Sequence, residues 1–185
     1  YLSIPMEQKV LSQIDVYVDT VEGVKIDNQQ LKNDLLNSSI LEKRISSNPK
    51  DYAYQDLHLP FSQSYTWLND YVRDHFNVDY NKVLVPTKEW GNIYLPKESS
   101  HSRHQVEPLS LKQSPDYTYI YCVEVAKNTC EFVMEYNDNR RANQTWHIPL
   151  ETNKLIIFPS TQRYFISQNT GKYMNVFITV NCEYV

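Results

Sequence analysis

Two of the five histidines of this chain lie close together, in the segment of residues 100–107 that reads S-H-S-R-H-Q-V-E. Imidazole and carboxylate groups are common ligands of divalent transition metals. On a strand, two ligands share one side when a single residue separates them. His101 and His104 are three apart, and the residues two positions after them are Arg103 and Val106. Arg103 would repel a divalent cation in a low-dielectric site. The segment therefore offers metal-binding residue types at a spacing that does not suit a metal.

Other classes of chemistry have less support in the sequence. It contains no G-x-S-x-G nucleophile motif, and with only three glycines it has no phosphate-binding glycine-rich loop. Three cysteines without a C-x-x-C pair, at Cys122, Cys130 and Cys182, predict buried reduced thiols and not a disulfide framework or zinc site. The net charge of −4 has no long run of either sign, so we expect no nucleic-acid partner.

Targeting signals are also not evident. No apolar run approaches the roughly 18–20 residues that span a bilayer, so we expect no membrane partner. The segment that starts Tyr1-Leu2-Ser3-Ile4-Pro5 has neither the basic nor the apolar region of a signal peptide. We therefore expect the protein not to be secreted by a signal peptide.

The first 79 residues predict one strand and two helices. Apolar and polar residues alternate over Val10–Glu22, which favours a strand. Apolar residues recur at helical spacing over Gln29–Lys43 and Ser62–Phe76, and Asp27 or Asn28, and Ser62 or Ser64, are placed to cap these helices. We expect residues 1–79 to pack on the remainder of the chain within one compact domain.

From about residue 80 the apolar pattern repeats every second residue, as in strands. Turn residues separate eight candidate strands, which are Lys82–Val85, Glu89–Leu95, Tyr117–Val125, Thr129–Glu135, Thr145–Ile148, Leu155–Phe158, Tyr164–Ser167 and Tyr173–Val180. Many short strands in this arrangement predict a jelly-roll-like barrel over residues 80–185. The fold class that we predict is α+β, with N-terminal helices packed on this barrel.

Several motifs in this second part resemble the 2-oxoglutarate/Fe(II) oxygenases, and particularly their small phage-encoded members. They are the strand with Trp90, Asn92 and Tyr94, the Ile148-Pro149 step, the Phe158-Pro159-Ser160 corner, and the alternating last strand. Asn153 occupies a turn position where the family usually has glycine, and asparagine tolerates a positive φ. The resemblance covers roughly Trp67–Val185 and implies a double-stranded β-helix, a jelly-roll or cupin-like barrel, as the core.

The resemblance also assigns positions to the family's site, which holds Fe(II) with two histidines and a carboxylate. His101, His104 and Glu107 would be the metal ligands of an active enzyme. The position of the family's distal histidine holds Tyr164, and that of the arginine that binds 2-oxoglutarate holds Asn175. In an active enzyme Asn92, Tyr94, Tyr121 and Asn175 would contact this cosubstrate, and Lys172 could replace the missing arginine.

These departures predict a catalytically inactive protein with an oxygenase-like frame, without Fe(II) or 2-oxoglutarate. The alternatives are an active, divergent 2-oxoglutarate/Fe(II)-dependent hydroxylase that uses both cofactors, and a small-molecule binder without metal.

The resemblance, with an Asn-, Lys-, Tyr- and Ile-rich composition, suggests a phage-encoded structural or binding module. It would reside in the virion or the host cytoplasm, with other virion proteins or a second copy as partner. Tyr117, Tyr119 and Tyr121 alternate on one strand and so share a face, which is either a buried sheet face or a contact surface for a partner.

Overall fold

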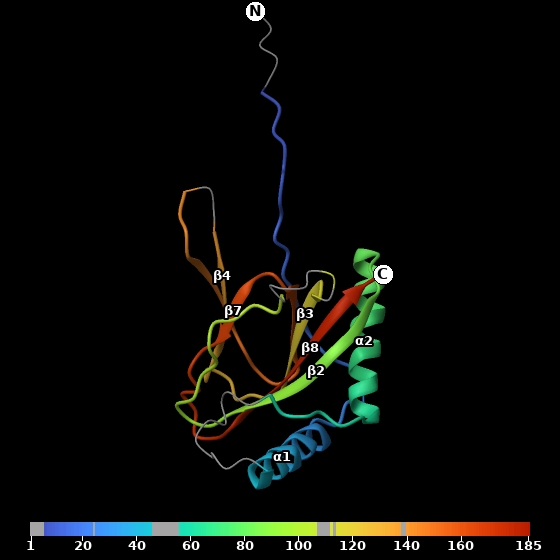
Figure 1. Ribbon diagram of the computed structural model, residues 1–185, viewed down its shortest axis with the longest axis vertical. Coiled ribbons are helices and arrows are strands. Elements are labelled where there is room, and N and C mark those ends of the chain that lie inside the picture. Colours follow the sequence, from blue (N-terminus) through green and yellow to red (C-terminus); the bar gives the residue numbers. More distant parts are fainter. Residues whose placement is uncertain (1–5, 24, 46–55, 107–111, 113, 138–139) are drawn as a thin grey trace, which may run out of the picture.

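The computed structural model describes residues 6–23, 25–45, 56–106, 112, 114–137 and 140–185, which form two facing sheets and two helices (Figure 1). The larger sheet has the order β1-β6-β3-β8-β2 and the smaller one β5-β4-β7. All named strand pairs are antiparallel. The strands are β1 (Tyr17–Thr20), β2 (Leu84–Tyr94), β3 (Tyr117–Glu124), β4 (Glu131–Tyr136), β5 (Gln144–Pro149), β6 (Lys154–Pro159), β7 (Arg163–Ile166) and β8 (Asn175–Tyr184).

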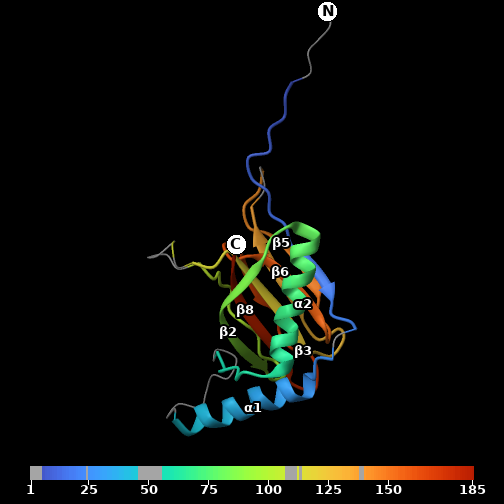
Figure 2. The ribbon, with the colours of Figure 1, turned by 90° about the vertical axis from the view of Figure 1, so that its right-hand side faces the viewer.

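Helices α1 (Asn28–Ile45) and α2 (Gln63–Tyr80) lie on the outer face of the five-stranded sheet (Figure 2). The Asp27 carboxylate accepts a hydrogen bond from the Gln30 amide at 3.0 Å, and the Ser62 hydroxyl accepts one from the Tyr65 amide at 3.2 Å. Each side chain thereby satisfies an amide of the first helical turn, as an N-cap does. Neither helix, within the part of the chain that the structure describes, is long and apolar enough to cross a membrane.

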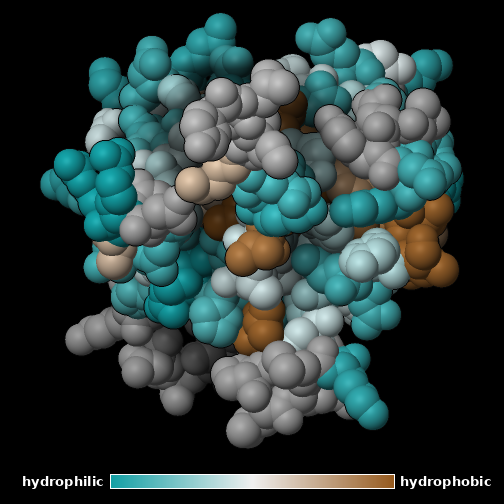
Figure 3. All heavy atoms as spheres, turned by 90° about the horizontal axis from the view of Figure 1, so that it is seen from above, coloured by the Kyte–Doolittle hydropathy of each residue, from teal (hydrophilic) through white to brown (hydrophobic). Residues whose placement is uncertain are grey.

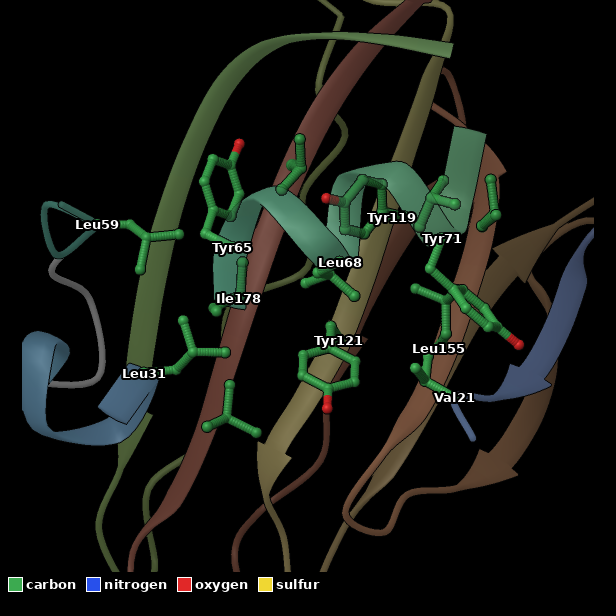
Figure 4. Packing of buried hydrophobic residues seen from close by; sticks show 14 of the residues in the cluster. Val21, Leu31, Leu59, Tyr65, Leu68, Tyr71, Tyr119, Tyr121, Leu155 and Ile178 are labelled. Carbon is green, nitrogen blue, oxygen red and sulfur yellow. The ribbon is translucent and has the colours of Figure 1, made fainter. Parts of the chain in front are cut away.

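A hydrophobic core fills the space between the helices and the five-stranded sheet (Figure 4). Tyr119 and Tyr121 project from β3 into this core, where Leu31 of α1 and Leu68 of α2 are fully buried. The Tyr119 hydroxyl donates to Asn69 of α2, and Tyr117 is half-buried against Phe76. Tyr119 is therefore inaccessible to a partner. For Tyr119 and Tyr121 the structure therefore shows the buried sheet face, one of the two interpretations that the alternation allowed, while Tyr117 lies at its partly exposed edge.

A second core lies between the two sheets and is rich in aromatic rings. Phe132 of β4, Phe158 of β6 and Tyr164 of β7 contact one another, with ring centroids 4.8–5.7 Å apart. Tyr94 of β2 and Phe177 of β8 pack together at 5.6 Å. These side chains occupy the interior of the barrel.

Three of the predicted strands differ from the structure in extent. The first strand is only β1. Residues 6–13 extend away from the sheets, and Ile14 and Val16 lie beside the β4–β5 hairpin without a strand partner among the described residues. The strands expected at Lys82–Val85 and Glu89–Leu95 are one strand, β2, with an irregular register between Pro86 and Lys88. Proline lacks the amide hydrogen that regular pairing needs, and this accounts for the interruption in the pattern.

The turn before β6 has the predicted asparagine conformation. Asn153 adopts a φ of 72°, and its side-chain oxygen accepts hydrogen bonds from Asn28 at 2.7 Å and from the Tyr121 hydroxyl at 3.0 Å. Asparagine thus replaces glycine and also joins α1 to the sheet.

Candidate functional site

Residues 100–105 run antiparallel to β7 and extend the smaller sheet on that side. Arg103 and Tyr164 form an isolated bridge with two backbone hydrogen bonds of 3.0 and 2.9 Å. The Ser100 amide donates to the Ile166 carbonyl at 3.1 Å, and the Gln105 amide to the Ser160 carbonyl at 3.0 Å. The segment in which the sequence predicted metal ligands therefore lies beside the strand that carries the distal position.

Arg103, Gln105 and Tyr164 direct their side chains toward one another. Bridge partners in antiparallel strands share a face, and so do residues two apart. The Gln105 side-chain amide donates to the Tyr164 hydroxyl at 2.8 Å, and the Gln105 oxygen accepts a longer contact from Asn181 at 3.4 Å. Arg103 and Gln105 are separated by one residue, His104, and both face the barrel interior. They have the spacing that a pair of metal ligands on a strand would need.

Tyr164 is a neutral phenol in this setting. Its side chain is 2% exposed and packs between Phe132 and Phe158. Burial raises its pKa above the ordinary value, although the Arg103 cation and the Gln105 hydrogen bond act in the opposite direction. Neutral phenol is a poor metal ligand, so this environment does not prepare Tyr164 to replace a histidine.

Arg103 is held by charged and aromatic neighbours. Its guanidinium lies 5.6 Å from the Trp90 ring centroid and 3.5 Å from an oxygen of Asp56, which also accepts from Asn92 at 3.1 Å. Burial alone would lower the pKa of Arg103, but Tyr164, Asp56 and Tyr94 raise the pKa above its usual range. The group is therefore a permanent cation at this end of the barrel.

The predicted metal residues are not assembled into a metal site. His101 is exposed, and His104 alternates with Arg103 and Gln105, so its side chain points away from them. Glu107 lies outside the described residues. Among the residues that the structure does describe, no three His, Cys, Asp or Glu side chains are grouped to hold a metal ion.

The predicted cosubstrate residues divide between the two faces of the large sheet. Asn92, Tyr94 and Asn175 are buried on the face toward the barrel interior. Asn175 is 1% exposed, and its amide donates to Thr129 at 3.2 Å and contacts the Cys130 sulfur at 3.4 Å. Tyr121 is on the opposite face, under the helices, so it cannot contact a ligand in the barrel.

These residues do not fit an Fe(II) centre. A facial site of two histidines and one carboxylate leaves open positions for cosubstrate and O₂. The three side chains that converge here are a guanidinium cation, a neutral amide and a neutral phenol, in contact with one another. Sequence reasoning named Arg103 and Tyr164 but missed Gln105 and Asp56. The one-residue spacing of Arg103 and Gln105 was the available signal for Gln105.

Comparison with known proteins gives structural matches only. No protein-family model matches the sequence, and no curated protein matches it. AviO1 from Streptomyces viridochromogenes aligns with a TM-score of 0.62 and 8% identity over 91% of this chain and 89% of AviO1. HygX from Streptomyces hygroscopicus, with nickel and 2-oxoglutarate bound, aligns with a TM-score of 0.61 and 7% identity over 92% of this chain and 83% of HygX.

An oxidoreductase of the 2OG-Fe(II) oxygenase family from Burkholderia pseudomallei aligns with a TM-score of 0.50 and 12% identity. The match covers 72% of this chain, which spans 64% of that protein's length. Identities at this level establish the fold and not the activity. The chain has the double-stranded β-helix fold of 2-oxoglutarate/Fe(II) oxygenase structures, and the predicted α+β class is confirmed.

Proposed function

We propose that this protein is a non-catalytic binding module built on the oxygenase fold. One observation carries the proposal: Arg103 and Gln105 converge on Tyr164, the residue at the position that the resemblance assigns to the distal metal ligand. A cation there opposes a divalent metal ion, and the converging amide and phenol are neutral. The nearby Asp56 carboxylate already contacts Arg103 and Asn92. The packed aromatic rings of the barrel interior further support a structural role for this region.

Ligand binding to the purified protein tests the proposal. Fe(II) or Ni(II) with 2-oxoglutarate should leave the melting temperature unchanged, because a ligand stabilises only a fold that binds it. HygX, whose solved structure contains nickel and 2-oxoglutarate, is the positive control. Stoichiometric metal binding together with conversion of 2-oxoglutarate to succinate would establish the alternative, a divergent hydroxylase.

The partner of this module is proposed to be a protein, in a phage virion or in the host cytoplasm. The sequence resemblance and the composition support this placement, and the lack of any long basic run disfavours nucleic acid. Mass spectrometry of purified virions tests it directly. Copies present in intact particles in fixed stoichiometry would support a virion role, and exclusion of the protein from particles would contradict it.

A further inference from the structure

The N-terminal arm, residues 6–16, leaves the body of the molecule along its longest axis (Figures 1 and 2). Its apolar side chains are uncovered: Met6 is 98% exposed, Val10 72% and Leu11 95%. On an extended chain the even-numbered residues share one side. Met6 and Val10 therefore lie on the same side of the arm as Ile14 and Val16. Within the described part of the chain, they are largely uncovered by other residues.

An apolar groove lies at the base of this arm. Met134, Tyr136 and Trp146 of the β4–β5 hairpin form it together with Ile14 and Val16, and its volume is about 270 Å³. Met134 and Trp146 are register partners on the side of the hairpin that faces the barrel interior. Trp146 is nonetheless 36% exposed, because the hairpin rises beyond the large sheet beside the arm (Figure 1). The groove is the uncovered continuation of the core between the sheets.

The arm and the groove are compatible in size and charge. A cavity of roughly 150 Å³ can hold a benzene molecule, so the groove has room for an aliphatic side chain. The arm carries Glu7 and Lys9 as an ion pair, and the adjoining surface carries Glu135 and Arg163, so neither side presents a single charge sign. Seen from the end that carries the arm, isolated hydrophobic residues interrupt a mostly hydrophilic surface (Figure 3).

We propose that two copies of this chain exchange their arms, with Val10 of each copy entering the groove beside Trp146 of the other. Val10 does not fill the groove of its own copy. Ile14 and Val16 hold the base of the arm at this groove, and the preceding residues of the arm lead away from the groove. Val10 lies four residues before Ile14 and reaches roughly 13 Å from it when the chain is extended, so the two grooves of this dimer lie close to its two-fold axis. Reciprocal exchange repeats the same contact twice and closes the assembly as a symmetric dimer. The proposal is independent of whether the barrel is catalytic.

Sedimentation of the intact chain and of matched variants tests this dimer. The wild type should be a dimer that dissociates on dilution. Val10→Asp and Trp146→Ser should each weaken dimerisation at least tenfold, since one places a charge in the groove and the other removes a groove wall. Tyr173→Asp is the control, because it removes another exposed aromatic residue and adds the same charge at a different place. A wild type that stays monomeric at high concentration overturns the proposal.

Mixed cysteine variants test the contact itself. Oxidation of Val10→Cys protein mixed with Trp146→Cys protein should give a covalent dimer, whereas either variant alone should not. The native thiols do not interfere, because burial raises the pKa of Cys130 to about 11 and that of Cys182 to about 12, and raises that of Cys122 too. Failure of the mixture to cross-link at a concentration where sedimentation shows it to be dimeric, or a dimer that both groove and arm variants leave intact, would show that a different surface makes the contact.

Discussion

At the scale of single residues, Arg103 links three parts of the molecule. Its backbone pairs with Tyr164 of β7, its guanidinium lies over Trp90 of β2, and it contacts Asp56 ahead of α2. An arginine held by a strand pair, an aromatic face and a carboxylate is well suited to tie elements together. A metal site at this place would need neutral or anionic ligands. The Arg103 side chain, fixed by these contacts, puts a cation there.

Grafting ligands onto these positions should create a metal site there. The triple variant Arg103→His, Gln105→Asp, Tyr164→His places two imidazoles and a carboxylate on the three converging side chains. Saturating Ni(II) should then raise its melting temperature by roughly 5–10 °C, the shift expected for a ligand at about a hundred times its Kd. Scanning calorimetry with and without Ni(II) measures the effect.

The control for this graft is Arg103→Ala, Gln105→Ala, Tyr164→Phe, which removes the same groups without adding ligands. It should show no response to Ni(II). A folded graft that responds no more than the control would mean that the three positions do not converge on one point.

We expect the folded state to lose stability at alkaline pH because of Tyr121. Burial raises its pKa to about 12, against an ordinary value near 10, and its hydrogen bond to Asn28 opposes the rise only in part. Between these two values the folded state retains a proton that the unfolded state loses, so stability is complete below about pH 10 and declines as the pH rises toward 12. By about pH 11 this group alone should lower the free energy of unfolding by about 1 kcal/mol.

Urea unfolding of the wild type and Tyr121→Phe, near neutral pH and at about pH 11, checks this expectation. The stability advantage of the wild type over Tyr121→Phe should shrink at the higher pH by about 1 kcal/mol. Tyr173→Phe, at an exposed tyrosine, is the control. An advantage that stays constant with pH would mean that Tyr121 is more accessible to solvent than the structure places it.

At the scale of elements, the approach of α1 to β2 depends on Gly91. A Cβ at this position would overlap the Leu35 side chain of α1. Gly91→Ala should therefore cost about 1–3 kcal/mol of unfolding free energy, the usual penalty for overpacking a core. The double variant Gly91→Ala, Leu35→Ala should lose less than the sum of the two single changes, because the smaller side chain makes room for the added methyl group. Strictly additive losses would contradict this contact.

The helices and most strands could be predicted because each depends on local patterns. Apolar spacing and caps located α1 and α2, and period-2 alternation located β3 to β8. The arm failed as a predicted strand because alternation indicates a face and cannot supply a partner strand. Tyr119 and Tyr121 were assigned to one face correctly, but the layer that covers this face is formed by α1 and α2, which are far away in the sequence.

The candidate site was harder to predict than the fold. The alignment of His101 and His104 with ligand positions rested on residue type, whereas the true register of the segment is fixed by its pairing with β7. A shift in register exchanges the side chains that face inward for those that face outward. Asp56 could not be assigned at all, since its contact with Arg103 joins residues 47 apart in the sequence.

At the scale of the whole molecule, the barrel and the N-terminal region share one core. Strand β1 completes the large sheet beside β6, and both helices cover the outer face of that sheet. Burial of an aliphatic or aromatic side chain contributes about 1.5–3 kcal/mol, and four helix residues, Leu31, Leu35, Leu68 and Phe76, are almost completely buried. Together they are comparable to the entire net stability of an ordinary domain, about 5–15 kcal/mol.

A fragment of residues 80–185 should therefore fail to fold by itself. Without the helices and β1, the outer sheet face would expose Tyr119, Tyr121, Val123, Ile178 and Val180, a contiguous apolar surface that promotes aggregation. Circular dichroism during urea titration should show no cooperative transition for the fragment, and the dye ANS should bind to it strongly, while the full chain should unfold cooperatively and bind little dye. Adding the 1–79 fragment in trans should restore the cooperative transition if the helix–sheet contacts stabilise the barrel without a covalent link between the two parts. A monomeric 80–185 fragment with a sharp transition would instead make the barrel an independent domain and reduce the helices to an accessory layer.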